Sequence, residues 1–317
     1  MKDATKIFTR HQANPLLQVK DFPGIAQLFN PSPVQYKDET ILLISVIPHK
    51  TDEIGRDVGQ TRIARSKDGI NFELSSEDFI KVDKNCSPFC YMKHFIDNRV
   101  TKIEDTYWIV TPVMMTGDWD APVALLGKTK DFVSYEPISV ITQPRNRGAS
   151  IFPEKINGMY YKIDRPNGIE GYSGDLWLSS SPDLIHWGNF QPLLKAGYRF
   201  WNMDKMGPTP PIKTDQGWLV IVHGVFTPAG GTTYYLGAIL LDLNDPSKVI
   251  GKTSSYILAP ETEYEQHGNS HNTVFACGAI ADYAQDKIRL YYGAADMSIG
   301  LATGSLSKLV EACIKEI

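Results

Sequence analysis

The sequence predicts an all-β fold, a five-bladed β-propeller that extends over residues 1–317 as a single domain and ends in a short C-terminal helix. Two short patterns, interleaved and each present five times, lead to this prediction, together with a scarcity of helical periodicity. The copies follow one another at roughly 50–65 residues, which is in the range of propeller blades. Length alone would allow one large domain or two smaller ones, so the repeats decide the architecture.

The first pattern is a strand end of small residues, followed by Ser/Thr-x-Asp and then by an aromatic residue. Its three full copies begin at Ser66, Thr129 and Ser181. Weaker copies lie at residues 241–248 and 301–308, and the last of these lacks the Asp. Each copy predicts the end of one strand in each blade.

The second pattern is a polar turn that opens an apolar or aromatic strand, which is a hairpin signal. Its copies lie at residues 37–44, 104–110, 157–163, 215–222 and 285–292. Each is followed by one copy of the first pattern, so each repeat contains at least two adjacent strands. Only residues 307–317 have a clear helical pattern.

Five short antiparallel sheets can protect their edges by circling an axis. A β-sandwich with accidental internal similarity is the alternative, and two patterns that share one order argue against it. In a propeller the inner strand ends and loops line the central channel. We therefore expect a site built from one or two residues of each blade, without a compact motif.

The composition is that of an ordinary globular protein, with 42% hydrophobic and 21% charged residues and a formal net charge of -4. This balance gives no support for a nucleic-acid or membrane partner. No apolar run approaches the roughly 18–20 residues that cross a bilayer. The first residues lack the apolar core of a secretory signal, so we expect a cytoplasmic location.

Four cysteines do not make a disulfide scaffold in a chain of this length. Cys86 and Cys90 form a close pair, and His94 and the pair His267/His271 are the nearest partners for a zinc ion. A structural metal is the minor alternative to reduced thiols. We expect no metal and no organic cofactor in the functional site, and the roles of His267 and His271 stay open.

Several charged and polar residues stand where inner strands would bring them to the axis. They are Asp97, Arg99, Arg147, Arg165, Lys205, His223 and Asp296. Taken singly, each is explained by a turn, a cap or a solvated loop. Taken together they belong to the same edge of successive blades, where the cations Arg147, Arg165 and Lys205 would repel one another unless an anion joined them. Phosphate is the natural occupant, because arginine and lysine both bind its oxygens.

Eight segments carry a resemblance to a known family. They are residues 14–17, 29–34, 64–69, 97–103, 152–158, 223–225, 240–251 and 291–296. Together they resemble glycoside hydrolase family 130, the β-mannoside phosphorylases and related hydrolases. The resemblance implies a five-bladed propeller and an inverting, reversible phosphorolysis of a β-mannoside that gives α-mannose 1-phosphate. The implied partners are a β-mannoside oligosaccharide and inorganic phosphate as co-substrate; the oligomeric state, a homo-oligomer included, stays open.

The resemblance also implies a role for each candidate residue. Asp97 matches the catalytic acid. The matches to the phosphate-binding set are Arg147, Arg165, Lys205 and His223. The matches to sugar-binding residues are Asn30, Arg99, Tyr234 and Asp296. One acid and three cations suffice for phosphorolysis, because phosphate is already an anionic nucleophile that needs positioning and charge compensation.

Two other functions remain as alternatives. The first is a β-mannoside hydrolase on the same propeller, which would use Asp97 with a second carboxylate such as Asp296 or Glu154. The second is a propeller that binds sugars without catalysis. Trp119 and Trp201 lie in predicted loops and are candidates to stack on sugar rings.

The chain departs from the family pattern near the predicted acid. Ile96 and Asn98 replace a Glu and a Pro, and Gly148 stands where an Asp is common. Ser45 falls where many members carry an Arg at the transferred sugar. These departures leave the acid and the phosphate set intact, but they leave open whether mannose is the transferred sugar, and also the linkage and the acceptor.

Overall fold

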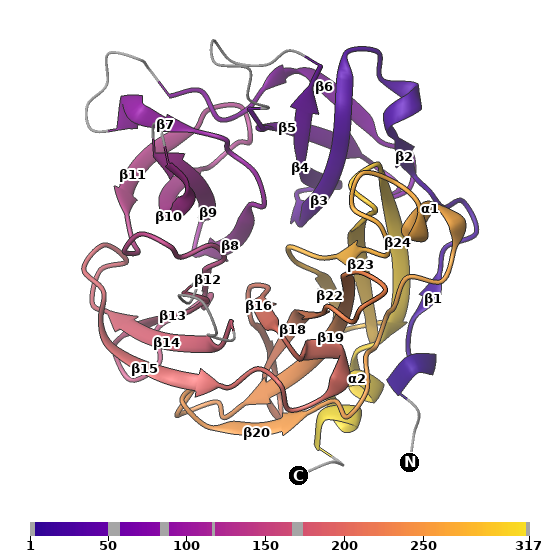
Figure 1. Cartoon of the computed structure of the whole chain (residues 1–317). Helices are drawn as coiled ribbons and strands as arrows, with labels where there is room; N and C mark the ends of the chain where they lie inside the picture. The colour runs from indigo at the N-terminus through magenta and orange to yellow at the C-terminus, as the bar shows by residue number, and fades with distance from the viewer. Residues whose placement is uncertain (1–3, 50–57, 83–88, 116–117, 167–173, 315–317) are drawn as a thin grey trace.

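Five antiparallel sheets surround a central axis in the computed structural model of the protein (Figure 1). The structure describes residues 4–49, 58–82, 89–115, 118–166 and 174–314. The sheets follow one another round the ring in chain order, and neighbouring strands within each are antiparallel. The predicted five-bladed propeller is therefore confirmed, and the two interleaved repeats mark its blades.

The first three blades come from the first two thirds of the chain. Blade 1 consists of β3 (Ile25–Tyr36), β4 (Glu39–Pro48), β5 (Gln60–Ser66) and β6 (Glu73–Asp78). Blade 2 consists of β7 (Met92–Lys93), β8 (Arg99–Ile103), β9 (Thr106–Met115), β10 (Asp118–Thr129) and β11 (Glu136–Val140). Blade 3 consists of β12 (Ser150–Ile151), β13 (Tyr160–Asp164), β14 (Leu176–Ser181) and β15 (Gly188–Leu194).

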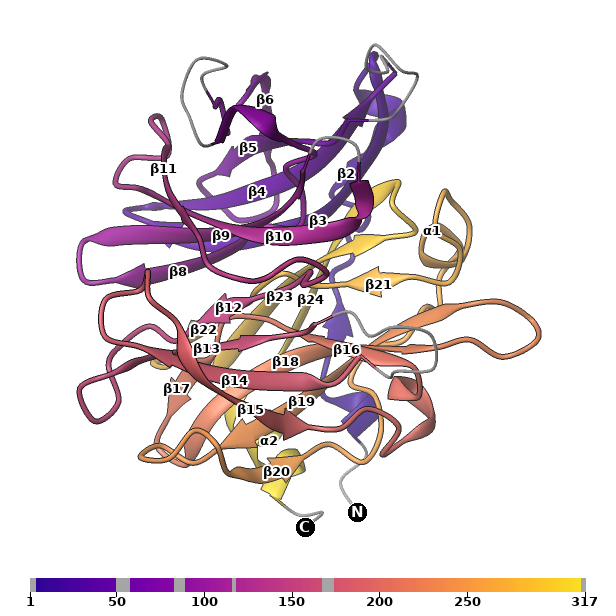
Figure 2. The same ribbon diagram turned by 60° about the vertical axis from the view of Figure 1, so that its left-hand side comes forward.

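The last two blades close the ring (Figure 2). Blade 4 consists of β16 (Lys205–Pro208), β17 (Ile212–Thr214), β18 (Gly217–Phe226), β19 (Thr233–Leu241) and β20 (Val249–Lys252). Blade 5 consists of β21 (Val274–Phe275), β22 (Ile280–Asp282), β23 (Lys287–Ala294) and β24 (Ser298–Ser305), with β1 (Thr9–Arg10) and β2 (Leu17–Gln18) from the start of the chain.

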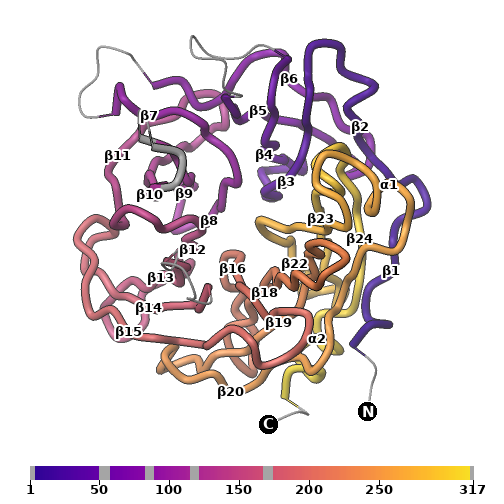
Figure 3. The backbone as a smooth tube through the Cα atoms, in the orientation of Figure 1, coloured from indigo at the N-terminus to yellow at the C-terminus, as the bar shows by residue number. Residues whose placement is uncertain are grey.

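The N-terminal segment thus forms the outermost strand of the last blade. Thr9 pairs with Thr303, and Leu17 pairs with Ile299. The tube in Figure 3 shows the indigo N-terminal segment running along the yellow C-terminal strands. Because both ends of the sequence build one sheet, strand pairing between them closes the ring.

Helices are few. The short ones are η1 (Ala4–Lys6), η2 (Val19–Asp21), η3 (Phe89–Tyr91), η4 (Phe200–Asn202) and α1 (Glu263–Gln266). The helix predicted over residues 307–317 is present as α2 (Leu306–Ile314), which buries Leu309 and Val310 against blades 4 and 5. Among the described residues, no helix is long and apolar enough to cross a membrane.

The Ser/Thr-x-Asp repeat has a local structural cause. In blade 1 the Oδ1 atom of Asp68 accepts the backbone N–H groups of Ile70 and Asn71, each at 2.8 Å. Asp131 and Asp183 accept the equivalent pairs of N–H groups in blades 2 and 3. Each Asp therefore closes a turn in place of a backbone acceptor and follows the strand next to the outermost one of its blade, namely β5, β10 or β14.

The fifth copy of this motif lacks its Asp, and another carboxylate takes its place. Asp286, in the turn before β23, accepts the N–H of Ser307 at 2.7 Å and the hydroxyl of Ser305. This contact ends β24 and caps the start of α2. Blade 5 keeps the same strand ending with a carboxylate from a different hairpin.

One expectation about the aromatic residues is wrong. Trp201 is fully buried and packs in an apolar cluster with Trp218, Met206 and Tyr198, so it cannot stack on a sugar. Its place in the core follows from its large apolar area, which is best removed from water. The side chain of Trp119 lies outside the described residues.

Candidate functional site

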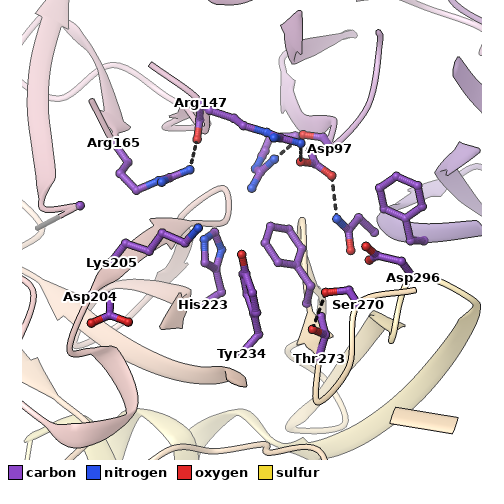
Figure 4. A pocket seen from close by; sticks show the side chains of 15 residues that line it. Asp97, Arg147, Arg165, Asp204, Lys205, His223, Tyr234, Ser270, Thr273 and Asp296 are labelled. Carbon is purple, nitrogen blue, oxygen red and sulfur yellow. Dashed lines mark hydrogen bonds and ion pairs between the residues drawn. The ribbon is translucent and has the colours of Figure 1, made fainter. Parts of the chain in front are cut away.

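A pocket of 490 Å³ opens at one end of the channel and draws on every blade. All nine residues that the sequence singled out line it: Asn30, Asp97, Arg99, Arg147, Arg165, Lys205, His223, Tyr234 and Asp296. Blade 1 contributes one, blades 2 and 3 two each, blade 4 three and blade 5 one. The structure thus brings the predicted set together, as expected for strand ends that converge on a propeller axis (Figure 4).

Asp97 is buried in the pocket and is hydrogen-bonded through both its backbone and its carboxylate. It is 5% exposed and has a left-handed backbone with φ of 55°. Its backbone N–H donates to Ser45 Oγ at 2.8 Å, and its carboxylate accepts from Asn30 Nδ2 at 2.7 Å and from Arg147 Nη2 at 3.1 Å. The guanidinium of Arg99 donates to its carbonyl oxygen.

The surroundings of Asp97 keep it ionised in the unliganded pocket. Burial alone would raise the pKa of this carboxyl group. The charges of Arg147 and Arg99 and the hydrogen bond from Asn30 outweigh burial and hold the pKa below its ordinary value. Asp97 is therefore a carboxylate at neutral pH until something changes the charges around it.

Asp296 forms the other acidic part of the pocket, in the turn between β23 and β24. Burial, and next the charge of Asp97, raise its pKa to about 7. Asn30 of blade 1 also lines the pocket, and its Oδ1 atom is buried and accepts no hydrogen bond from the described residues. A carboxyl group and an orphaned amide oxygen are suited to the hydroxyl groups of a sugar.

Three cations occupy the opposite part of the pocket from Asp296 (Figure 4). Arg165 is 7% exposed and donates to the carbonyl oxygen of Arg147 at 2.7 Å. Burial and the neighbouring charge of Arg147 lower the pKa of Arg165 to about 10, so it remains charged at neutral pH. Lys205 lies with its Nζ atom 5.3 Å from the ring centroid of Tyr234. An oxyanion among these groups would relieve their repulsion.

His223 completes the cationic part as a neutral group. Its ring lies on Phe275, with centroids 4.3 Å apart, and on Gly207, where any Cβ would stand 2.1 Å from the imidazole Cε1. Burial, followed by the charges of Arg165 and the other cations, lowers the pKa of His223 well below its ordinary value. A neutral imidazole offers one donor and one acceptor, and Nδ1 is buried without a partner among the described residues.

Sequence reasoning missed six residues that line the pocket: Phe29, Gly174, Asp204, Ser270, Thr273 and Phe275. In the sequence Phe29 and Phe275 could not be distinguished from apolar core residues. The only signal was their position, Phe29 beside Asn30 and Phe275 shortly before Cys277. Ser270 and Thr273, whose hydroxyls are 2.9 Å apart, stand in a loop without a recognisable motif. Asp204 was visible as the neighbour of Lys205.

Comparison with known proteins identifies the family. The model of glycoside hydrolase family 130, described as beta-1,4-mannooligosaccharide phosphorylase, matches residues 5–315. The chain belongs to glycoside hydrolase family 130. It is 40% identical over 253 residues to a beta-1,2-mannobiose phosphorylase from Listeria innocua, which covers 78% of this chain and 67% of that protein.

Two further matches extend over nearly the whole of this family 130 chain. A beta-1,4-mannooligosaccharide phosphorylase from Ruminococcus albus is 31% identical over 314 residues, covering 98% of this chain and 91% of that protein. The solved complex of the Listeria innocua beta-1,2-mannobiose phosphorylase with beta-1,2-mannobiose covers 98% of this chain and 99% of that one, with a TM-score of 0.85 and 30% identity. The resemblance noted in the sequence is confirmed.

Two of the departures from the family 130 pattern, Ser45 and Asn98, make buried hydrogen bonds next to Asp97. Ser45, fully buried on β4, is the acceptor for the Asp97 N–H. Asn98 is also fully buried; it donates to Thr61 and accepts from Thr111. Both polar side chains therefore fix the segment that carries Asp97 from behind.

One proposed partner of Asp97 does not reach the pocket. Glu154 is half exposed, pairs with Lys213 at 2.5 Å and is not among the lining residues. The hydrolase alternative that relied on Glu154 is therefore not favoured. Its sequence position after blade 3's inner strand places it beyond the channel, where a solvated ion pair is the ordinary outcome.

The cysteine and histidine candidates do not form a metal site within the described residues, where no group of three or more His, Cys, Asp or Glu residues could hold a metal. Cys86 lies outside the described residues. His94 accepts the N–H of Gly59 through Nδ1 at 3.0 Å. His267 and His271 are exposed, with ring centroids 6.4 Å apart, on the loop that also carries Ser270.

Proposed function

We propose that this protein catalyses the reversible phosphorolysis of a β-mannoside, releasing α-mannose 1-phosphate and the free acceptor sugar. The observation that carries the proposal is a pocket that brings three cations and a neutral histidine together with the buried carboxylate of Asp97. The names of the relatives from Listeria innocua and Ruminococcus albus, both mannoside phosphorylases, support it.

The chemistry follows from the distribution of charge. A phosphate held by Arg147, Arg165 and Lys205 would attack the anomeric carbon while the carbon–oxygen bond to the acceptor breaks on the opposite face. Asp97, once protonated, supplies the proton that the departing oxygen needs. The proton of hydrogen phosphate replaces the one that Asp97 gives up, so no net proton is released. The anomeric configuration is inverted.

The transferred sugar would lie between Asp97 and Asp296. This region offers the free oxygen of Asn30 and the Asp296 carboxyl group, both of which suit sugar hydroxyls. Phe29 and Phe275 supply the apolar surfaces that pack against a sugar ring. The phosphate would lie on the side of Arg147 that faces Arg165 and Lys205.

A hydrolase would need a second, ionised carboxylate to activate water. Glu154 is outside the pocket, and Asp296 lies across the pocket from Arg165 and Lys205 (Figure 4). The arrangement therefore favours phosphate over water as the nucleophile.

The test is the phosphate dependence of cleavage. Beta-1,2- and beta-1,4-mannobiose should each be offered with and without inorganic phosphate, and the products followed by NMR. We expect α-mannose 1-phosphate from at least one of them, only with phosphate. Equal cleavage without phosphate would contradict the proposal.

A substitution of the acid completes this test. Asp97→Asn should lower kcat by about 10²- to 10⁴-fold, since it removes the proton donor but keeps the shape. Binding of the mannobiose should persist. Asp105→Asn, at an exposed turn of the same blade, is the matched control and should act like the wild type. A wild-type rate in Asp97→Asn would refute the assignment of the acid.

A further inference from the structure

The side chain of Arg147 connects the two halves of the pocket. It makes an ion pair with Asp97 at 3.1 Å, and it lies between Asp97 and the other cations, Arg165 and Lys205 (Figure 4). The same guanidinium therefore belongs to two sites. In the unliganded pocket it neutralises the acid, whereas phosphorolysis requires it to neutralise phosphate.

The surroundings of Arg147 hold its backbone and leave its side chain room to move. Its carbonyl oxygen accepts from Arg165, and the preceding residue, Asn146, is bridged to Pro166. The side chain is 35% exposed, against 7% for that of Asp97. Gly148 follows with φ of 125°, so the chain turns away directly after Arg147.

Phosphate and Asp97 must compete for this guanidinium. A bound dianion gathers the arginine by charge-assisted, bidentate hydrogen bonds. Its negative charge also lies near Asp97 and disfavours the carboxylate form. By thermodynamic linkage, a ligand that makes Asp97 easier to protonate binds more tightly when Asp97 is protonated.

We propose that Arg147 makes cleavage conditional on phosphate: in the empty pocket it locks Asp97 as a carboxylate, and phosphate draws the guanidinium away so that Asp97 takes up the proton it later donates. This inference rests on the proposed phosphorolysis. It gives Arg147 a role beyond holding phosphate, since it also prevents the acid from acting when only water is present.

Other charged groups face Asp97 and have to be separated from this effect. They are Arg99 on β8, His94 ahead of Asp97, Arg165 after β13, Asp296 in the β23–β24 turn and Cys277 after β21. Arg99 holds the Asp97 carbonyl oxygen and stays in place. Asp296 is the strongest competitor for a proton, because burial and the charge of Asp97 raise its pKa to about 7.

Proton uptake on phosphate binding is the direct test. Binding of inorganic phosphate, without sugar, should be measured by calorimetry in two buffers of different ionisation enthalpy. The wild type should take up a larger fraction of a proton than Asp97→Asn, with a difference that approaches one. Using the difference cancels the protons that phosphate itself gains or loses.

Matched variants assign this proton. The variant Asp296→Asn should take up more protons on phosphate binding than the double variant Asp296→Asn with Asp97→Asn. The difference should equal that between the wild type and Asp97→Asn, since the proton belongs to Asp97. Arg147→Gln should reduce the uptake, whereas Arg145→Gln, an exposed arginine two residues away on the same loop, should not change it. Equal proton uptake in the wild type and Asp97→Asn would overturn the inference.

The pH dependence of affinity separates this role from simple phosphate binding. In the wild type the phosphate Kd should rise with pH more steeply than in Asp97→Asn, by up to tenfold more per pH unit between the two Asp97 pKa values. If Arg147 only held phosphate, Arg147→Gln would weaken phosphate binding equally at every pH. We expect Arg147→Gln also to reduce the slope of the phosphate Kd against pH. An unchanged slope would refute the coupling.

This result can be distinguished from a failure of the proposed function. Cleavage that needs no phosphate refutes phosphorolysis itself. Cleavage that requires phosphate, with equal proton uptake in the wild type and Asp97→Asn, leaves phosphorolysis standing and refutes only the role of Arg147.

Discussion

Three residues of the pocket share an unusual backbone. Asn30, Asp97 and Asp296 have φ of 47°, 55° and 57°, in the left-handed region that residues other than glycine seldom adopt. Each such residue costs about 1–3 kcal/mol and persists where its surroundings hold it. All three line the part of the pocket that is proposed to hold the transferred sugar.

Ser45 provides the clearest test of that support. In Ser45→Ala the buried N–H of Asp97 would lose its acceptor, a loss of about 1–3 kcal/mol of unfolding free energy. Asp97 would also lose its fixed position, so kcat should fall about 10- to 100-fold. The KM for phosphate should hardly change, because Ser45 does not line the cationic part of the pocket.

Steady-state kinetics and urea unfolding would measure both effects. Ser139→Ala, on the outer strand β11, removes a hydroxyl far from the pocket and should leave both quantities unchanged. A wild-type kcat in Ser45→Ala would show that Asp97 is positioned by other contacts. An equal loss in kcat and in phosphate affinity would mean a general collapse of the pocket.

The sequence predicted nine pocket residues but not the six others that line the pocket with them. Charged residues at strand ends stand out in a sequence, and blade repetition indicates which ends converge, whereas Asn30 and Tyr234 were predicted only from the resemblance to family 130. Ser270 and Thr273 reach the pocket through backbone hydrogen bonds from Ser270 to Ala295 and from Ala295 to Thr273, at 3.1 Å each. Such pairing of one loop on another depends on the finished fold, so no local pattern could reveal it.

At the scale of the element, the Asp that follows the strand next to the outermost one of a blade was predictable because its cause is local. Asp131 accepts the N–H groups of Val133 and Ser134 at 2.9 Å each, within four residues of chain. The corresponding role of Asp286 in blade 5 was not predictable, because Asp286 and Ser307 are 21 residues apart. Sequence patterns reveal turns that are closed by their own residues.

These turns also predict how stability responds to acid. Hydrogen bonds from the N–H groups of Ser134 and Val133 lower the pKa of Asp131 to about 2. A depressed folded pKa means stabilisation that is complete above the unfolded value of about 3.9 and lost as pH falls through about 2. Asp131→Asn, which cannot ionise, should have a lower Tm than the wild type at pH 7, and the gap should narrow below pH 4.

Thermal unfolding at several pH values between 7 and 3 would follow this gap. The control is Asp38→Asn, at the exposed turn before β4. A gap of constant size over the whole range would show that the charge of Asp131 does not contribute to the turn.

At the scale of the whole molecule, closure of the ring depends on the beginning of the chain. The strands β1 and β2 have two residues each, too short for any sequence pattern to announce them. The repeats predicted five blades but not that residues 9–18 belong to the last one. Besides its strand pairing, this segment makes a long-range contact between Arg10 on β1 and Glu265 in α1.

This contact is a buried latch. Glu265 is fully buried and accepts from Arg10 through Nε at 2.7 Å and Nη2 at 2.8 Å, and from the hydroxyl of Tyr292 at 2.7 Å. Arg10 also meets Glu261 at 2.8 Å, but Glu261 is 58% exposed. One arginine therefore has a buried and an exposed partner, which allows a matched comparison.

Replacing Arg10 should destabilise the closed ring. Arg10→Gln leaves a buried carboxylate without its cation, which should lower the unfolding free energy by about 3 kcal/mol. Glu261→Gln should cost less than about 1 kcal/mol, because water screens an exposed ion pair. Urea unfolding of both variants measures the difference. Equal effects would mean that the pairing of β1 with β24, and not the buried charge, holds the first residues to blade 5.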